Sequence, residues 1–385
     1  MEYFGRVVLA GLLLLFRVGN VRGAEVVNGL APCNFPAIYN FGDSNSDTGG
    51  ISAAFQRTPP PNGQSFFGKP SGRVCDGRLI IDFIAENLGL PYLSAYLDSI
   101  GTNFRHGANF ATGGSTIRRQ NETIFEAGIS PFSLDVQLWH FDQFQERTSE
   151  ARNTSEDSGK LPKPEEFSKA LYILDIGQND LSVGFRKMTD SQIRASIPDI
   201  LDHFSAAVQQ LYERGARSFW IHNTGPIGCL PIYRIYSPPP DPGLVDPYGC
   251  IKSHNDIAME FNRLLKDKVM KLRSELSHAA LTYVDVYAAK YGLISRSNSQ
   301  GFVDPQKICC GHHESYHVWC GQNAMINGSE VYGAPCGDPS IYISWDSIHY
   351  TEAANHWVAN HILDGSLSDP PLPITQACHK QVHQL

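Results

Sequence analysis

The chain has 385 residues, of which 42% are hydrophobic and 18% are charged, and its formal net charge is −8. This is the composition of a globular protein with enough apolar residues for a sizeable core, which excludes a disordered or fibrous chain. The acidic balance also argues against nucleic acid and anionic membrane surfaces as partners, because both require a basic face.

The first 24 residues have the pattern of a secretory signal peptide. Arg6 precedes an apolar run over residues 7–16, and the small residues Gly23 and Ala24 follow. The run is shorter than the ~20 residues of a membrane-spanning helix, so a retained signal anchor is the lesser alternative. Cleavage removes three basic residues and one acidic residue, so the net charge of −8 becomes −10. We therefore expect a secreted chain, not inserted in a membrane, in which residues 25–385 form a single domain.

The first predicted strand ends at a candidate nucleophile. Residues 37–41 form an apolar run of strand length that Gly42 breaks, so Ser44 falls where a buried strand turns into a loop. In an open parallel sheet, sites form at such strand ends. Glycine, aspartate and serine are also common in solvated turns, which is the competing interpretation of this short motif.

Two segments downstream offer hydrogen-bond donors for a reacting oxygen. After an irregular stretch over 55–75 and a predicted helix over 77–89, residues 107–115 predict a loop with adjacent glycines, Gly113 and Gly114. A backbone N–H without a neighbouring side chain can approach a bound molecule closely, although the pair also fits a plain turn. The next strand, over 170–176, leads to Asn179, whose amide can donate to an oxyanion or cap a helix together with Asp180.

The rest of the chain continues the alternation of strand and helix. Strands are predicted over 218–222 and 281–286, and helices over 191–214, 253–276 and 351–363. This order predicts an α/β fold of three layers, with a parallel sheet between two layers of helices. Residues 145–166, 237–250 and 296–340 show no period, and loops of this length are usually functional or solvent-facing insertions.

Asp346 and His349 precede the last predicted helix and complete a set of catalytic groups. A serine hydroxyl is a poor nucleophile until an imidazole takes its proton, and the imidazole needs a carboxylate to hold its tautomer. Ser44, His349 and Asp346 supply one group of each kind. The combination predicts an esterase, whereas a solvated turn is the alternative for Asp346 and His349 alone.

Nine cysteines and three glycosylation sequons agree with export. The acceptor residues are Asn121, Asn153 and Asn327. An odd number of cysteines leaves at least one unpaired within the chain or paired between molecules. In an oxidising compartment we expect most to form structural disulfides.

Particular disulfides follow from the positions of the cysteines. Cys229 and Cys250 flank a proline-rich loop and are predicted to pair with each other. A second disulfide is predicted from Cys309 or Cys310 to Cys336, with Cys310 preferred. Cys33 and Cys378 are predicted to be free or variable. Cys309, Cys310, His312 and His313 also resemble metal ligands, but a second spaced pair of zinc type is missing, so we expect no metal and no other cofactor.

Taken together, four blocks of the sequence resemble the plant GDSL esterase/lipase family of the SGNH hydrolase superfamily. The blocks are residues 41–49, 109–114, 177–180 and 346–349, and the shared stretches 77–83 and 225–231 lie between them. The resemblance covers nearly the whole chain after the leader. It implies an SGNH-hydrolase fold, in which a flavodoxin-like parallel sheet is flanked by helices and carries long loop insertions.

The resemblance also implies roles for particular residues. Ser44 is the nucleophile and donates its backbone N–H to the oxyanion, Gly114 supplies a second N–H with Gly113 as the alternative, and Asn179 supplies a third donor. His349 is the base, oriented by Asp346. Position 50 is glycine where many family members have asparagine, as in a subgroup of early nodulin-like proteins, proteins once called α-fucosidases, and acetylesterases.

The leading hypothesis is a serine carboxylic ester hydrolase of the extracellular space, with the vacuole as an alternative location. It would release a short or aromatic acyl group from a plant metabolite or glycan through an acyl-Ser44 intermediate, since its polar loops do not favour triglyceride. An acyltransferase with the same intermediate and a catalytically silent defence or storage glycoprotein are the alternatives. A glycosidase that uses two of Asp43, Asp47 and Asp180 is a weaker option. The sequence does not bear on the oligomeric state.

Overall fold

The computed structural model describes residues 29–120, 128–153, 159–313 and 316–380. The predicted signal peptide over residues 1–24 therefore lies outside the described residues. From residue 33 onward, the described residues cluster into one compact unit. Within the described part of the chain, no helix is both long enough and apolar enough to cross a membrane.

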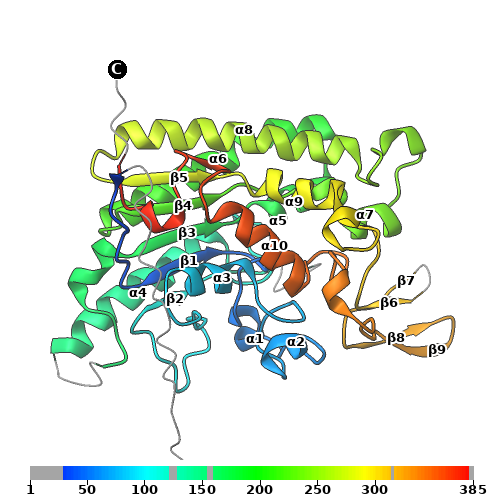
Figure 1. Cartoon of the computed structure of the whole chain (residues 1–385), viewed down its shortest axis with the longest axis horizontal. Coiled ribbons are helices and arrows are strands. Elements are labelled where there is room, and N and C mark those ends of the chain that lie inside the picture. Colours follow the sequence, from blue (N-terminus) through cyan, green and yellow to red (C-terminus); the bar gives the residue numbers. More distant parts are fainter. Residues whose placement is uncertain (1–28, 121–127, 154–158, 314–315, 381–385) are drawn as a thin grey trace, which may run out of the picture. The chain divides into compact units, whose positions relative to one another are not determined.

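A six-stranded sheet forms the centre of this unit (Figure 1). Five strands run parallel, and β10 pairs antiparallel with β5 at one edge. In space the parallel strands follow the order 2-1-3-4-5, which is the flavodoxin-like order. The strands are β1 (Ile38–Gly42), β2 (Gly107–Asn109), β3 (Leu171–Asp175), β4 (Ser218–His222), β5 (Ala280–Val284) and β10 (Ser368–Asp369).

Two sets of helices cover the two faces of the sheet, as Figure 1 shows. On one face, α6 (Asp190–Glu213) packs between α4 (Leu134–Asn153) and α8 (Lys252–Glu275). On the other face, α10 (Glu352–Ile362) packs against both α3 (Ile80–Asn87) and α9 (Val286–Ser295). The strands are buried between these helices, as expected for a parallel sheet with both faces covered. The predicted three-layer α/β fold is therefore confirmed.

The long helices form where the pattern of apolar residues and caps predicts them. α6 begins after a capping box, in which Thr189 and Gln192 satisfy each other's backbone N–H groups, and it buries an apolar face that includes Ile197 and Phe204. The predicted bounds of α6, α8 and α10 lie within two residues of the observed ones. The shorter helices are α1 (Gly50–Ala54), α2 (Gln64–Phe67), α5 (Gln178–Lys187) and α7 (Pro231–Tyr236).

Several segments differ from the predictions made for them. The stretch 145–166 was expected to be irregular, but α4 continues to Asn153, because a helix whose exposed face is rich in charged and polar residues gives little apolar period. Residues 107–109, expected in a loop, form the edge strand β2. Residues 296–340 contain two small hairpins, formed by β6 (His312–His313) with β7 (Tyr316–His317) and by β8 (Asn323–Ile326) with β9 (Ser329–Tyr332).

Four disulfides crosslink the unit. The predicted bond between Cys229 and Cys250 is present, and so is the bond between Cys309 and Cys336. The preferred pairing of Cys310 with Cys336 is wrong, because Cys310 bonds to Cys320. Adjacent residues of an extended chain point to opposite sides, so the two neighbouring cysteines reach different partners.

The chain ends also depart from the prediction. Cys33 and Cys378, expected to be free or variable, form a disulfide with Cα atoms 5.9 Å apart. A separation of 345 residues hides this proximity, which arises only once the fold brings the two ends together. Among the described residues, the free cysteine is Cys75, which is buried.

Candidate active site

Ser44 lies in a tight turn at the carboxyl end of β1. The turn is closed by Ser46, whose N–H donates to the carbonyl of Asp43 over 3.1 Å, and Ser44 itself is half-buried. Gln137 of α4 fixes the last residue of the strand, since its side chain accepts from the N–H of Gly42 at 3.0 Å and donates to the carbonyl of Gly42 at 2.8 Å. The candidate nucleophile therefore stands on a rigid strand end, near the β1–β3 point where the strand order reverses.

Asp346 and His349 form a buried pair in the loop before α10. Nδ1 of His349 lies 2.7 Å from Oδ2 of Asp346, and the other carboxylate oxygen accepts the backbone N–H of His349 at 2.8 Å. Between them Ser347 has a φ of 82°, which is uncommon for a residue other than glycine. Such strain is often found at functional sites. This turn brings the carboxylate and the imidazole face to face.

The other ring nitrogen of His349 is available for proton transfer. Nε2 is buried and has no hydrogen-bond partner among the described residues. Burial alone would lower the pKa of His349, but the neighbouring Asp346 carboxylate outweighs it and raises the pKa above its ordinary value. Asp43 raises the same pKa further, which means that the turn of Ser44 and the loop of His349 lie close enough for their charges to interact.

One of the two candidate glycines is free to donate to a substrate. The N–H of Gly113 is already used, since it donates to Oδ2 of Asp47 at 2.7 Å. The N–H of Gly114 donates to no atom of the described residues. Gly114 has a φ of 78°, and a Cβ there would lie 2.3 Å from the carbonyl oxygen of Gly128, so only glycine fits. The geometry therefore favours Gly114 over Gly113 as a donor.

Asn179 and Asp180 both hold the loop that carries Gly114. Nδ2 of Asn179 donates to the carbonyl of Ser115 at 2.9 Å, which leaves its second N–H for another acceptor. The carboxylate of Asp180 accepts the N–H groups of Ile117 at 2.8 Å and Arg118 at 3.1 Å. Burial raises the pKa of Asp180 to about 7. The segment after β3 thus positions the glycine loop besides presenting an amide.

A cluster of titratable groups, which sequence reasoning did not find, lies behind the Ser44 turn. Its members are the buried residues Asp43, His222 at the end of β4 and Lys290 of α9, together with the partly exposed Asp175 at the end of β3. Burial and the nearby Asp175 raise the pKa of Asp43 to about 6. Nδ1 of His222 lies 3.5 Å from Oδ2 of Asp175, and despite its partial burial Asp175 keeps a lowered pKa because of His222 and Lys290.

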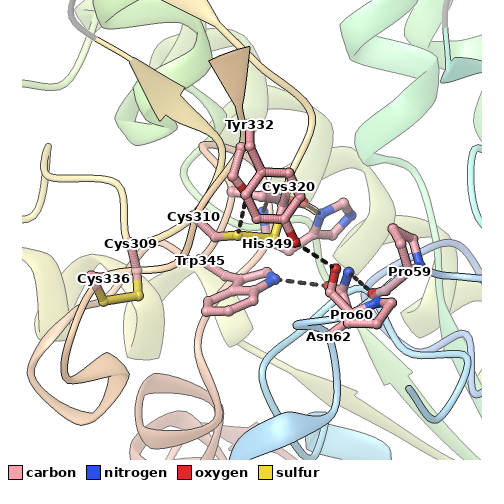
Figure 2. Close-up of a disulfide and its surroundings, with 12 residues drawn as sticks. Pro59, Pro60, Asn62, Cys309, Cys310, Cys320, Tyr332, Cys336, Trp345 and His349 are labelled. Carbon is pink, nitrogen blue, oxygen red and sulfur yellow. Dashed lines mark hydrogen bonds and ion pairs between the residues drawn. A yellow bond between two sulfur atoms is a disulfide. The ribbon is translucent and has the colours of Figure 1, made fainter. Parts of the chain in front are cut away.

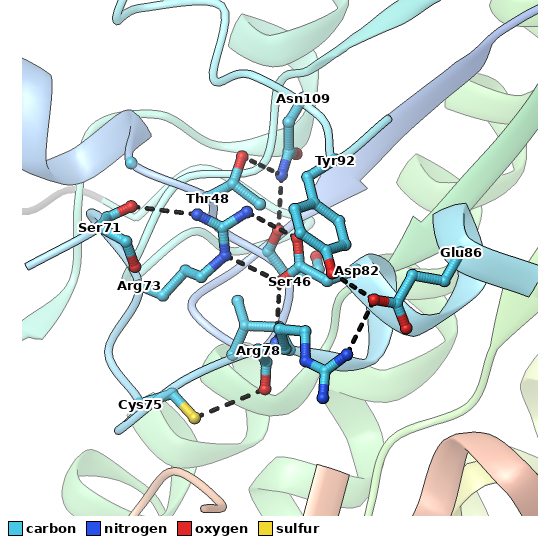
Figure 3. A network of polar contacts seen from close by, with 12 residues as sticks. Ser46, Thr48, Ser71, Arg73, Cys75, Arg78, Asp82, Glu86, Tyr92 and Asn109 are labelled. Carbon is cyan, nitrogen blue, oxygen red and sulfur yellow. Dashed lines mark hydrogen bonds and ion pairs between the residues drawn. The ribbon is translucent and has the colours of Figure 1, made fainter. Parts of the chain in front are cut away.

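Further polar contacts surround the segment that follows Ser44 (Figure 3). Asn109 donates to the carbonyl of Ser46 at 2.6 Å and to the hydroxyl of Thr48 at 2.9 Å, as the sticks in Figure 3 show. Arg78 pairs with Glu352, the first residue of α10, over 2.6 Å. Asn109 of β2 thus fixes the segment after Ser44, and Arg78 fixes the start of the helix after His349.

Residues 309–336, described except for 314 and 315, form a disulfide-bonded lobe beside the site (Figure 2). The N–H of Cys310 donates to the carbonyl of Trp345 at 2.6 Å, and Trp345 points toward Asn62, to which its Nε1 donates at 2.9 Å. Burial lowers the pKa of His317 of β7, and the nearby charge of Asp346 opposes that shift. The lobe thus braces the segment that leads to Asp346. Because Cys309 and Cys310 are in disulfides, their sulfurs are not the thiolates that zinc requires.

The three sequons fall in different places. Asn121 lies outside the described residues, and Asn153 is the last residue of α4. Asn327 is exposed at the turn between β8 and β9. Asn327 is therefore open to a modifying enzyme.

With this geometry in view, comparison with known proteins identifies the family. The sequence pattern of the GDSL-like Lipase/Acylhydrolase family matches residues 38–362. The chain belongs to this family. It is similar to GDSL esterase/lipase At5g14450 of Arabidopsis thaliana, with 61% identity over 353 residues and 91% of each chain covered.

Two other relatives represent the subgroup that the sequence resembles. GDSL esterase/lipase ENOD8 of Medicago truncatula is 46% identical, with 91% of each chain covered. A protein named Alpha-L-fucosidase 3, from Arabidopsis thaliana, is 49% identical over 91% of this chain and 93% of its own length. The chain is thus a carboxylic ester hydrolase of the plant GDSL esterase/lipase group.

The carboxylates considered for a glycosidase have other partners. Asp47 accepts the N–H groups of Gly49, Ile51 and Gly113 among others, and Asp180 accepts two more from the glycine loop. Asp43 accepts both the N–H and the side-chain amide of Asn45. These roles in holding loops do not favour a pair of carboxylates that act as acid and base.

Proposed function

We propose that this GDSL hydrolase is secreted and cleaves a short-chain or aromatic acyl ester of a plant metabolite or glycan through an acyl-Ser44 intermediate. The observation that carries the proposal is the buried, unpartnered Nε2 of His349, whose Nδ1 is held 2.7 Å from Asp346. A ring oriented in this way is ready to take a proton from a hydroxyl at Nε2.

The reaction would proceed in two steps. Oγ of Ser44 attacks the ester carbonyl carbon and its proton passes to Nε2 of His349, which then gives the proton to the departing alcohol. Water attacks the acyl-enzyme with His349 again as base, and the acid product leaves. Asp346 stabilises the imidazolium in both steps while remaining ionised.

Three donors would stabilise the oxyanion of each tetrahedral intermediate. They are the backbone N–H groups of Ser44 and Gly114 and the second N–H of the Asn179 side chain. Support comes from the free N–H of Gly114 and from the bond between Asn179 and Ser115, which ties the start of α5 to the loop that carries Gly114. Donors held in advance need no reorganisation when negative charge develops.

A groove near the site has the size for the non-reacting part of a glycan or glycosylated substrate. Its volume is about 1000 Å³, at the upper end of ligand sites. The N–H of Ile232, near the start of α7, donates to the carbonyl of Ser347 at 3.1 Å, and Arg234 in the same helix lines the groove. Since a helix rises ~1.5 Å per residue, the groove begins within one turn of the Asp346–His349 loop.

The groove combines positive charge with an aromatic ring. Within the described residues, the guanidinium groups of Arg234 and Arg296 form no ion pair, and the ring of Tyr248 is partly exposed beside them. Aromatic rings and arginines suit sugars that carry carboxylates or aromatic acyl groups. An acylated acidic glycan and a phenolic ester of a sugar are therefore the substrates to test first.

The first experiment tests the nucleophile. Purified protein is treated with a fluorophosphonate probe and the labelled peptide is sequenced, in parallel with Ser44→Ala and with Ser46→Ala as the matched control. We expect labelling at Ser44, none in Ser44→Ala and near-normal labelling in Ser46→Ala. Wild-type turnover by Ser44→Ala on its best ester would refute the proposal.

The second experiment tests the substrate and the reaction. Acetylated uronate oligosaccharides, acetylated neutral xylo-oligosaccharides, phenolic esters and p-nitrophenyl esters are compared by kcat/KM, with and without an alcohol acceptor. Transfer of the acyl group to the acceptor in preference to water would make the chain an acyltransferase. For export, the test is whether the protein appears outside plant cells and begins near residue 25.

A further inference from the structure

Lys290 of α9 is a buried lysine without a carboxylate partner in direct contact. Only 6% of the residue is exposed. Its Nζ lies 3.4 Å from Oδ1 of Asn45 and 4.8 Å from the centre of the Tyr350 ring, and among the described residues it forms no ion pair. An ammonium group taken out of water is costly unless its surroundings compensate for it. A fold that keeps such a group invites a functional explanation.

The two residues that Lys290 contacts are neighbours of the proposed nucleophile and base. Asn45 directly follows Ser44, and Tyr350 directly follows His349. Asn45 also donates from its N–H at 2.9 Å and from Nδ2 at 2.8 Å to Oδ1 of Asp43. The residues on both sides of Ser44 are therefore bonded to each other, and this unit contacts the ammonium group.

The side chain of Lys290 has little room to move. A Cβ at Gly225 would lie 2.9 Å from Cδ of Lys290 and 3.6 Å from its Nζ, so the absence of a side chain at position 225 makes space for the lysine. A cavity of about 10 Å³, lined by Lys290, Asp43 and Asp175 among others, separates the charged groups. It is at the lower limit of what holds one water molecule.

We propose that Lys290 is a positioning residue of the active site, whose buried ammonium group holds the Ser44 loop and the His349 loop together by contacting Asn45 and Tyr350. The inference rests on the proposed function and gives Lys290 no contact with the substrate. It also assigns a role to Gly225 in the stretch 225–231, which the chain shares with its family. The absence of a side chain at position 225 provides the space that the lysine occupies.

The charge of Lys290 has a second effect on the base. His349 faces Asp346 and Asp43, which favour its protonated form, and Lys290, which disfavours it. Asp175 and His222 lie behind them and interact with each other and, through Asp175, with Lys290. Removing the ammonium group should therefore raise the pKa of His349, so that the base becomes protonated at a higher pH than in the wild type.

The central test compares Lys290→Met with Lys290→Arg. Methionine keeps much of the shape and removes the charge, so we expect kcat to fall ~10–100-fold with little change in KM, as for a small misplacement of reacting groups. The acid limb of kcat/KM should move to higher pH. Arginine keeps the charge but is larger than the space beside Gly225, so kcat can change, whereas the acid limb should stay at its wild-type pH.

Two further variants keep the test decisive if Lys290→Met does not fold, as judged by circular dichroism. Tyr350→Phe keeps the ring and removes a hydroxyl that has no partner, whereas Tyr350→Leu removes the ring. We expect the leucine variant to lose more kcat than the phenylalanine variant, and equal effects would contradict the proposal. Lys268→Met, which removes a partner of Asp202 on α6, is the matched control and should behave as wild type.

The outcomes separate this inference from the proposed function. If a fluorophosphonate fails to label Ser44 in the wild type, the proposed function fails. If the wild type is labelled but Lys290→Met reacts at the same rate and with the same pH dependence, only the role of Lys290 is overturned. Slower labelling of Lys290→Met with a displaced acid limb, and a wild-type acid limb in Lys290→Arg, would support it.

Discussion

Two regions of the molecule are held in place by different physical means. At the carboxyl edge of the sheet the loops are held without covalent bonds, since the buried carboxylates of Asp47 and Asp180 accept backbone N–H groups from the glycine loop. The disulfide-bonded lobe has a small core of three cysteines and Trp345, and its hairpins leave large side chains such as Trp319 and Met325 exposed. There two disulfides take the place of an apolar core.

The difference between the two regions predicts which substitutions should reduce activity most. At the sheet edge, each buried polar group leaves a partner unsatisfied when it is removed, and the partner is next to the reacting atoms. In the lobe, a broken disulfide loosens the chain at a distance from Ser44. We therefore expect losses of activity to become smaller from the sheet edge to the lobe and then to the chain ends.

The largest effect is expected for His349→Ala at the sheet edge. Losing the base of a serine hydrolase costs ~10⁶-fold in kcat when the catalytic residues act as a unit. In the wild type, kcat/KM should fall as the pH drops through the pKa of His349, which Asp346 holds above the ordinary value. Kinetics from pH 5 to 9 measures both, and an activity flat over this range would contradict a histidine base.

Asn179→Ala should have the next largest effect. We expect kcat to fall ~10²–10³-fold with a smaller rise in KM, because the amide meets negative charge mainly in the transition state. The variant also removes the bond from Asn179 to the carbonyl of Ser115, so the position of the loop needs a control. Asp180→Asn keeps an acceptor for only one of the N–H groups of Ile117 and Arg118 and so weakens the hold on the loop. A loss as large as that of Asn179→Ala would indicate that both residues act through the loop.

Breaking the lobe should weaken activity moderately. Replacing Cys309 and Cys336 by serine opens a bond across 27 residues, which is worth ~3 kcal/mol in the chain-entropy treatment. We expect the melting temperature to fall, and kcat to fall less than in Asn179→Ala, because Asp346 is braced less firmly. Steady-state kinetics with calorimetry tests this, and a kcat loss equal to that of His349→Ala would mean that the lobe belongs to the catalytic machinery.

The smallest effect on activity is expected at the chain ends. Replacing Cys33 and Cys378 by serine should lower the melting temperature, since the bond closes a loop of 345 residues, worth ~6 kcal/mol in the same treatment. The value of kcat at 25 °C should stay close to that of the wild type. A large loss of kcat in a folded variant would show that the ends of the chain control the site.

The sequence predicts those parts of the fold that depend on local pattern. The apolar runs at β1, β3 and β4 and the amphipathic helices α6 and α8 carry their own period, so their bounds are close to the observed ones. β2 has three residues, and the exposed face of α4 is polar, so neither gives a pattern that stands out from a loop. Edge strands and solvated helices depend on tertiary contacts for their identity.

The same distinction applies to the site. Ser44, Asp346 and His349 can be selected from the sequence because their chemistry is recognisable in a short motif. Lys290 cannot, because a lysine in a helix is usually exposed, and its burial depends on Gly225 and on loops far away in the chain. The pairing of Cys33 with Cys378 is equally non-local. A contact between residues that are far apart in the sequence cannot be predicted from the residues next to either of them.

The bond between Cys33 and Cys378 turns the described unit into a covalent ring. The ring includes the Ser44 turn, the glycine loop and the Asp346–His349 loop. Residues before 33 and after 378 are not part of it. A protease that cuts the ring once, for example in the exposed proline-rich segment between Cys229 and Cys250, would leave the nucleophile and the base in one covalent molecule. To separate them, a protease would have to cut once between Ser44 and His349, outside the span of a smaller disulfide, and once more between Cys33 and Ser44 or between His349 and Cys378.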